Sequence, residues 1–229
     1  TVGSSMTKAN TALSEAKTKE DSAQIKTQLQ SLGGLLESFR DSMTKAYPDG
    51  FMAALFRAMK DPEVPPAAEH PGGKYSAEFA YRYYKSHYWD GISFDDDRLT
   101  RTPFFENKLD RYFKDLVSPA PDSITKEVDH MILYSRASKD MYQYLMVYFV
   151  QRYINPEYMG QDAVFVHLFE KYINTGQADF FTKEYNEYMT KRAYSLMANL
   201  IGLPASNLEM VDTLGRPTPL FLAERLSKE

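Results

Sequence analysis

The alternation of apolar and polar residues predicts a chain built almost entirely of α-helices. In the segment from Ile25 to Ala46, apolar residues recur every three or four positions, as they do along one face of an amphipathic helix. Gly33 and Gly34 interrupt this segment and should each cost about 1 kcal/mol relative to alanine. Three heptads also permit pairing with a second helix, so an oligomer formed through Ile25–Ala46 is an alternative to packing within the chain. The apolar seam has the spacing 4-3-4-3-4-3 and consists of Ile25, Leu29, Leu32, Leu36, Phe39, Met43 and Ala46.

The first 61 residues are predicted to form a set of N-terminal helices. Residues 1–24 show weaker apolar spacing and are predicted to form a helix of low stability. Pro48-Asp49-Gly50 ends that helix, and a short helix with Phe51, Leu55 and Met59 on one face follows. Four prolines and two glycines then occur between residues 61 and 73. Because this composition excludes helix and central strand, residues 62–74 are predicted to be a loop or linker.

Residues 75–200 are predicted to form the main helical body. Thr102-Pro103 has the form of a cap followed by proline at the first helical position. Asp122 or Ser123, Ser138 and Asp162 are expected to open three further helices, the last running to Asn174, and a stretch from Asp179 to Leu200 closes the set. The residues predicted to face inward in the first two of these helices are Leu109, Tyr112, Phe113, Leu116, Ile124, Val128, Met131 and Ile132.

These segments together predict an all-α fold, a multi-helix bundle of antiparallel helices that begins with an N-terminal helical hairpin. After Ile201 the pattern changes to a short polar–apolar alternation, followed by the turn-forming string Leu214-Gly215-Arg216. Residues 201–229 are therefore expected to be a short irregular or β tail.

Composition limits the possible functions. Hydrophobic residues make up 43% of the chain and charged residues 25%, which is ordinary for a folded domain. The net charge of −4 and the absence of a basic stripe argue against nucleic-acid binding. No run of about 18 apolar residues occurs, so we expect no membrane insertion. The chain has no cysteine, which excludes a thiolate nucleophile or ligand.

The other chemistry-bearing residues do not form a recognisable site. Glu127 and His130 have the Glu-x-x-His spacing of di-iron bundles, but that motif is needed twice and occurs once. The acidic run Asp95–Asp97 lacks the glycine and closing glutamate of a calcium loop and is expected to cap a helix start. We expect His167 to be a satisfied, partly buried residue and His70 to be exposed. The chain is therefore expected to be non-catalytic, with no metal and no cofactor.

An aromatic group is the best candidate for a binding surface. Aromatic residues lie on every face of the predicted helix that runs from Tyr75 to Tyr88, so some of them should be exposed unless the helix is buried all round. Tyr84, Tyr88 and Trp89 are the candidate binding residues, and they could contact a peptide or a glycan. The alternative is that they pack in the core. The whole group is Phe79, Tyr81, Tyr83, Tyr84, Tyr88 and Trp89.

Several strings, taken as a set, resemble a known kind of domain. It is the uncharacterised helical domain that precedes the thioredoxin-like domain in some bacterial envelope proteins of the thiol-disulfide oxidoreductase (TlpA-like) group. The resemblance covers about residues 48–220 and departs from the group at Ser206, where proline is usual. The strings are Tyr88-Trp89-Asp90, Phe94 with Asp95, Arg98 to Pro103, Met159 to Leu168, and the closing Ile201-Gly202-x-Pro204-Ala205 with Asp212-x-x-Gly215.

This resemblance implies a role but no activity. In that group a Trp-Cys-x-x-Cys redox site follows the closing string, whereas this chain reaches Glu229 without a cysteine, so no catalytic residue can be carried over. The resemblance implies a periplasmic or cell-envelope location and an accessory role beside a thioredoxin-like domain, in positioning it or in protein interaction. Because the chain begins at Thr1, it is expected to be a trimmed piece. The alternative function is a free-standing peptide- or glycan-binding helical module.

Overall fold

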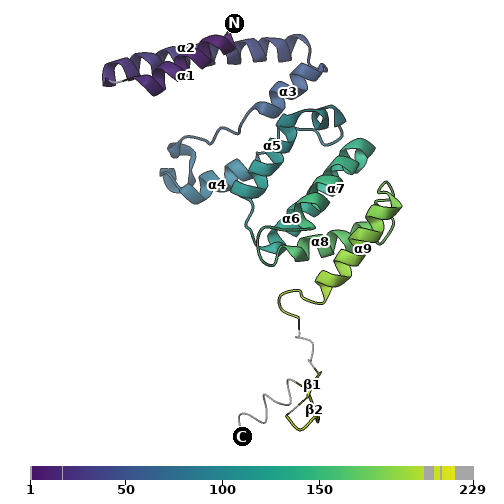
Figure 1. Ribbon diagram of the computed structural model, residues 1–229. Coiled ribbons are helices and arrows are strands. Elements are labelled where there is room, and N and C mark those ends of the chain that lie inside the picture. The colour runs from purple at the N-terminus through teal and green to yellow at the C-terminus, as the bar shows by residue number, and fades with distance from the viewer. Residues whose placement is uncertain (1, 17, 204–208, 212, 220–229) are drawn as a thin grey trace. The chain divides into compact units, whose positions relative to one another are not determined.

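The computed structural model describes residues 2–16, 18–203, 209–211 and 213–219, and it confirms the all-α fold class (Figure 1). Within these residues the structure has nine α-helices and a single two-stranded sheet. The chain divides into two compact units. The first comprises residues 1–116 and 134–141, and the second comprises residues 117–133 and 142–229.

The first unit begins with three helices, of which α1 and α2 form a helical hairpin. Helix α1 (Val2–Glu15) packs along α2 (Lys19–Ala46), and α3 (Phe51–Met59) packs against the end of α2. The side chain of Thr18 caps α2 by accepting a hydrogen bond from the backbone N–H of Asp21 at 3.1 Å. Five members of the apolar seam of α2 are half-buried, whereas Phe39 and Ala46 are exposed. The seam is therefore covered in part by helices of the same chain.

The proline-rich segment after α3 is tied to a buried histidine. It contains two 3₁₀ turns, η1 (Ala67–Glu69) and η2 (Pro71–Gly73). The expectation that His70 is exposed was wrong, because its side chain is buried between them. The backbone N–H of Ser76 donates to His70 Nδ1 at 3.0 Å, so the ring proton is on Nε2, which donates to the carbonyl of Pro65 at 2.9 Å. Both ring nitrogens of His70 are thus hydrogen-bonded to the backbone, and these two bonds order the loop.

The rest of the first unit supplies its aromatic core. It includes α4 (Ala77–Ser86), the 3₁₀ helix η3 (Asp97–Arg101), α5 (Pro103–Arg111), and a π-helical turn, η4 (Tyr112–Leu116). Proline stands at the first position of α5 as predicted, but the Thr102 side chain makes no cap and donates to the Leu99 carbonyl instead. The four predicted inward residues, Leu109, Tyr112, Phe113 and Leu116, are all buried.

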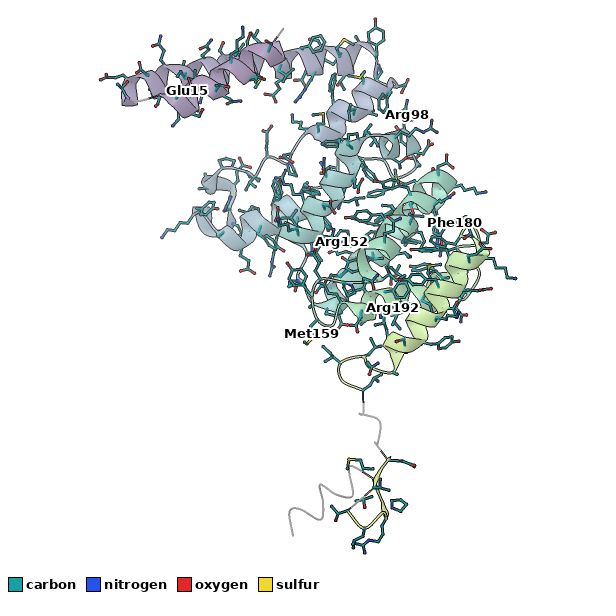
Figure 2. All side chains as sticks on the ribbon, viewed as in Figure 1. Glu15, Arg98, Arg152, Met159, Phe180 and Arg192 are labelled. Atoms are coloured by element: carbon teal, nitrogen blue, oxygen red, sulfur yellow. The ribbon has the colours of Figure 1, made fainter. Side chains whose placement is uncertain are left out.

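The second unit contains α6 (Pro121–Tyr134), α7 (Lys139–Tyr153), α8 (Asp162–Leu168), the π turn η6 (Phe169–Ile173) and α9 (Lys183–Met197), and Figure 2 shows their side chains. The division between units falls within α6 and α7, so the 3₁₀ turn η5 (Ser135–Ala137) belongs to the first unit. Ser138 caps α7 as predicted. Ile124, Val128, Met131 and Ile132 are buried, as their spacing predicts.

Two helices of the second unit differ from their predicted extent. The segment from Asp162 to Asn174 was expected to be one α-helix, but it widens into the π turn η6, in which the backbone N–H of Asn174 bonds to the carbonyl of Phe169 at 2.8 Å. Helix α9 begins after Thr182, whose hydroxyl accepts from the N–H of Tyr185. It is therefore shorter than the predicted 179–200.

The predicted β tail is present in the described residues. Strand β1 (Glu209–Val211) pairs antiparallel with β2 (Pro217–Pro219), and Met210 faces Thr218 in the register. The sequence strings around Pro204-Ala205-Ser206 and Asp212, which carry part of the resemblance, lie outside the described residues.

Candidate functional site

The three predicted binding residues lie together in the first unit, and Tyr88 is at their centre. Its side chain is 1% exposed, and its hydroxyl donates a hydrogen bond to the backbone carbonyl of Lys108 at 3.1 Å. Burial raises the pKa of Tyr88 to about 12. A ligand could not reach this ring without opening the core, so Tyr88 positions its neighbours.

Trp89 lies against this centre and is half-buried. Its ring centroid is 4.9 Å from that of Tyr88, 5.0 Å from Tyr112 and 5.6 Å from Phe94, each in an edge-to-face arrangement. The indole N–H is buried and has no hydrogen-bond partner among the described residues. The ring therefore packs as part of an aromatic cluster, and its polar atom does not point to solvent.

Tyr84 is the third predicted residue and is also half-buried. Its hydroxyl accepts a hydrogen bond from Arg111 at 2.7 Å, and Arg111 pairs with Asp61 at 3.2 Å. Burial and the nearby Asp61 carboxylate raise the pKa of Tyr84. Tyr84 and Trp89 are thus the two predicted residues with solvent-accessible surface, and Tyr88 supports them from below.

A buried lysine beneath this cluster caps α3. Lys108 is 6% exposed, and its Nζ atom donates to the carbonyl oxygen of Ala58 at 2.7 Å. The same ammonium group lies 4.8 Å from the ring centroid of Tyr88 and 5.8 Å from that of Phe104. Burial lowers the pKa of Lys108. The positive charge is stabilised by two ring faces and by the negative end of the α3 dipole.

Gly91 brings a second backbone segment to the same helix end. A Cβ atom at this position would lie 2.2 Å from the carbonyl oxygen of Arg57, so only glycine fits. The backbone at Gly91 therefore lies directly against the C-terminal turn of α3.

A hollow of about 410 Å³ lies beside this junction. We call it the α3–α4 hollow. Tyr83 and His87 form one wall, with ring planes 18° apart and centroids 4.0 Å apart. His87 Nδ1 lies 2.8 Å from the carbonyl of Tyr83, which fixes the ring on α4. The remaining lining residues are Arg57, Lys60, Asp61, Pro62, Glu63, Asp90 and Gly91.

The sequence reasoning included Tyr83 in the aromatic group but missed His87. The signal was present, because residues four apart on a helix share a face and their rings can stack. Of the aromatic group, Tyr88 is buried, Tyr81 is exposed, and Tyr83 is half-buried beside His87.

Helix α3 exposes three of its five large apolar residues, whereas Leu55 and Phe56 are half-buried. Phe51, Met52 and Met59 are 37%, 46% and 37% exposed, whereas the residues it buries are the three alanines Ala53, Ala54 and Ala58. Burial of large side chains normally stabilises a fold more than burial of alanine. We call Phe51, Met52 and Met59 the α3 outer face. An exposed apolar face of this kind is typical of an interaction surface.

A polar cluster in the second unit is centred on Asp129 of α6. Its carboxylate accepts hydrogen bonds from His167 Nε2 at 2.9 Å, Lys171 Nζ at 2.7 Å and the Tyr172 hydroxyl at 2.7 Å. Partial burial acts to raise the pKa of Asp129, but the hydrogen bonds from Lys171, His167 and Tyr172 outweigh it and lower that pKa. The π turn η6 supplies Lys171 and Tyr172, because its wider turn brings residues at i, i+4 and i+5 to one side.

This cluster joins α6 to the α8–η6 segment and satisfies His167, as the sequence reasoning expected. Among the described residues no group of three or more histidines and carboxylates could hold a metal ion. The Asp129 cluster is best explained as a structural clamp.

The acidic run in the first unit also has a structural role. Asp96 caps η3 by accepting from the backbone N–H of Arg98, and both its carboxylate oxygens accept from the Arg98 guanidinium. These hydrogen bonds lower the pKa of Asp96. Arg98 also reaches the carbonyl of Asp49 at 3.1 Å, which ties this loop to the α2–α3 turn. The predicted capping role of the run is confirmed.

Comparison with known proteins gives a family. A family model described as a domain of unknown function (DUF5106) matches residues 8–195. The chain belongs to this family. Neither the curated proteins nor the solved structures give a significant match to it. The DUF5106 match covers all nine α-helices of the described residues except the ends of α1 and α9, so it covers the helical part of both units.

The DUF5106 assignment is consistent with a helical domain and assigns no activity. None of the described helices combines the length and apolar character needed to cross a membrane. Within the described residues the strongest candidates for function are therefore surfaces, namely the α3 outer face and the α3–α4 hollow.

Proposed function

We propose that this chain is a non-catalytic protein-interaction domain that acts beside a thioredoxin-like domain in the bacterial envelope. It would position that domain or recruit its protein substrate. The observation that carries the protein-contact part is the α3 outer face, which leaves Phe51, Met52 and Met59 in solvent. The thioredoxin part and the periplasmic location rest on the sequence resemblance alone.

The α3 outer face is suited to contact with protein. Methionine side chains are flexible and polarisable, so they adapt to the shape of an apolar partner. Lys108 and Gly91 fix the C-terminal turn of α3 from behind, and Arg98 and Arg57 bind the carbonyls of the preceding turn. The orientation of α3 is therefore fixed before a partner binds, which lowers the conformational entropy lost on binding.

The first test of the accessory role is to sequence the gene beyond the codon for Glu229. A Trp-Cys-x-x-Cys string within the next few dozen codons would support the accessory role, and a stop codon there would refute it. The second test uses the full-length protein that the gene encodes, called the intact product below. In the intact product, oxidation of Met52 and Met59 by hydrogen peroxide is then followed by mass spectrometry. The matched reference is the 229-residue chain.

The α3 contact predicts a severalfold slower oxidation of Met52 and Met59 in the intact product. Met159 is 92% exposed and gives the oxidation rate of an unprotected methionine. Met189 is buried and gives the oxidation rate of a protected methionine. Equal rates at Met52 and Met59 in the two proteins would show that the α3 outer face does not contact the additional domain, even where the redox string is present.

A second candidate function is a free-standing peptide- or glycan-binding module. The observation that favours it is the α3–α4 hollow with its stacked Tyr83–His87 wall. Aromatic rings bind apolar side chains and sugar faces alike. The test is binding to arrays of short peptides and of glycans. The signals should disappear for His87→Ala and persist for Tyr134→Ala, an exposed aromatic of the same unit.

A further inference from the structure

Between Gln24 and Ala46, one face of α2 is exposed and carries no charge. Seven residues between Gln24 and Ala46 form it, and all seven are exposed. At 3.6 residues per turn they fall within about 80° of the helix circumference. None of the charged residues of α2 belongs to this set. We call it the α2 stripe, and its members are Gln24, Gln28, Ser31, Leu35, Phe39, Ser42 and Ala46.

Two large apolar residues lie at the middle of the stripe. Leu35 is 59% exposed and Phe39 is 56% exposed, although both could gain free energy by leaving water. The apolar seam of α2 is half-buried against its own chain, and its two exposed members, Phe39 and Ala46, are the ones that belong to the stripe. The stripe is thus a second face, distinct from the one used within the chain.

The spacing of the stripe fixes the register of an antiparallel pair. Its spacing is 4-3-4-4-3-4, which reads the same in both directions about Leu35. In a two-fold antiparallel pairing about Leu35, each Phe39 would meet Ser31 of the other copy, a large side chain against a small one. Ser42 would meet Gln28, and Ala46 would meet Gln24. A closed two-fold interface needs this kind of self-complementarity.

The charges at the two ends of α2 favour the same orientation. The first turn of α2 carries Lys19, Glu20 and Asp21 and is therefore net acidic, and the last turn carries Lys45. An antiparallel pairing brings the acidic first turn of one copy beside the basic last turn of the other and also sets the two helix dipoles antiparallel. A parallel pairing would bring like charges together at both ends.

We propose that α2 is a self-association surface, on which two copies of this chain pair antiparallel through the α2 stripe with a two-fold axis at Leu35. The stripe is about 33 Å long and about 10 Å wide, so it buries roughly 350 Å² of each copy. This is less than half of the roughly 800 Å² per partner of a standard stable interface, so the dimer is weak and concentration-dependent. The inference does not depend on the proposed function.

Cysteine cross-linking tests the axis directly, because the chain contains no cysteine of its own. Leu35→Cys should form a disulfide-linked dimer under mild oxidation, since the two thiols meet at the axis. The matched control is Glu37→Cys, an exposed position on the opposite side of α2. Dimer yield for Leu35→Cys no greater than for Glu37→Cys would overturn the proposal.

A mixing experiment tests the orientation. Ser31→Cys and Phe39→Cys should each cross-link poorly alone, because in the antiparallel pair two equivalent residues lie about 12 Å apart along the helix axis. A disulfide requires Cα atoms within about 7 Å. Equal mixtures of the two variants should cross-link efficiently. Efficient cross-linking of each variant with itself would show a parallel pair and would refute the antiparallel axis.

Sedimentation of the unaltered chain, which needs no variant, tests the association itself. Its average mass should rise with concentration up to the millimolar range, and the rise should be lost in Leu35→Asp with an unchanged circular dichroism spectrum. A constant monomer mass over the whole series would show that a second copy does not cover the stripe.

Discussion

Lys108 Nζ and the carbonyl oxygen of Ala58 are joined by a 2.7 Å hydrogen bond between residues fifty positions apart. Through it, α5 supplies a cation to the end of α3, where the last carbonyls of a helix lack partners within the helix. The bond holds α3 from its buried side. It therefore links the aromatic cluster around Tyr88 to the orientation of the α3 outer face.

Replacing Lys108 should destabilise the first unit. Lys108→Met keeps most of the apolar stem but leaves the buried Ala58 carbonyl without its donor, and we expect a loss of about 1–3 kcal/mol in the free energy of unfolding. Lys108→Ala adds a cavity and should cost roughly 2–5 kcal/mol. Urea denaturation followed by circular dichroism measures both. The control is Lys114→Met at an exposed position, which should change the free energy of unfolding by less than about 0.5 kcal/mol. If Lys108→Met changed that free energy no more than Lys114→Met does, the capping role of Lys108 would be contradicted.

Gly91→Ala should be strongly unfavourable. The added methyl group would lie 2.2 Å from the Arg57 carbonyl oxygen, and backbone atoms on both sides must move to relieve the clash. We expect a loss of about 1–3 kcal/mol, the usual cost of overpacking. The thermal unfolding midpoint reports it. A midpoint unchanged from wild type would show that the α3 end and the Asp90–Gly91 turn are not in close contact.

Gly34→Ala should have the opposite effect. Gly34 lies inside α2 with ordinary helical backbone angles, and no neighbouring atom lies within 4 Å of the position that an added methyl group would take. Alanine reduces the conformational freedom of the unfolded chain, so the free energy of unfolding should rise by about 0.5–1 kcal/mol. Urea denaturation tests this with Gly91→Ala as the contrasting variant. A destabilising result would indicate that a close neighbour, such as a second copy, occupies that space.

The Asp129 cluster predicts a specific dependence of stability on pH. The folded state lowers the pKa of Asp129 below its ordinary value of 3.8, so its stabilisation is fully present above that value and is lost as the pH falls through the lowered pKa. Asp129→Asn should therefore cost about 1–3 kcal/mol near neutral pH. The difference from wild type should shrink in strongly acidic solution.

Urea denaturation at a series of pH values measures this difference. Glu170→Gln, an exposed carboxylate on the same π turn, is the control and should show little effect at any pH. A difference between wild type and Asp129→Asn that stayed constant from neutral to strongly acidic pH would rule out the ionised carboxylate as its source.

The helical architecture could be predicted because its signal is local. Val128 and Ile132 recur with the period of a helix, and both are fully buried in α6. The π turns were missed because an i to i−5 hydrogen bond, such as that from Asn174 to Phe169, has no distinct residue pattern. His70 was placed wrongly because its burial depends on the Pro65 carbonyl and the Ser76 amide, which meet the ring only in the folded loop.

The candidate surfaces depended even more on tertiary structure. Spacing showed that Phe51 and Met59 share a face of α3, but only the packing of Ala53, Ala54 and Ala58 shows which face is turned to solvent. Lys108 resembles an ordinary helix lysine in the sequence, because its partner Ala58 lies in another helix. Of the predicted binding residues, Tyr88 packs in the core, and no local pattern separates a buried tyrosine from an exposed one.

The first unit is discontinuous in sequence, since it comprises residues 1–116 and 134–141. During synthesis, the first unit is therefore not fully outside the ribosome until residue 141 has passed through the exit tunnel. By then the first segment of the second unit, residues 117–133, has also been made. The N-terminal unit of this chain therefore cannot complete its fold until a segment of the second unit has been made, although residues 142–229 of that unit are not needed for it.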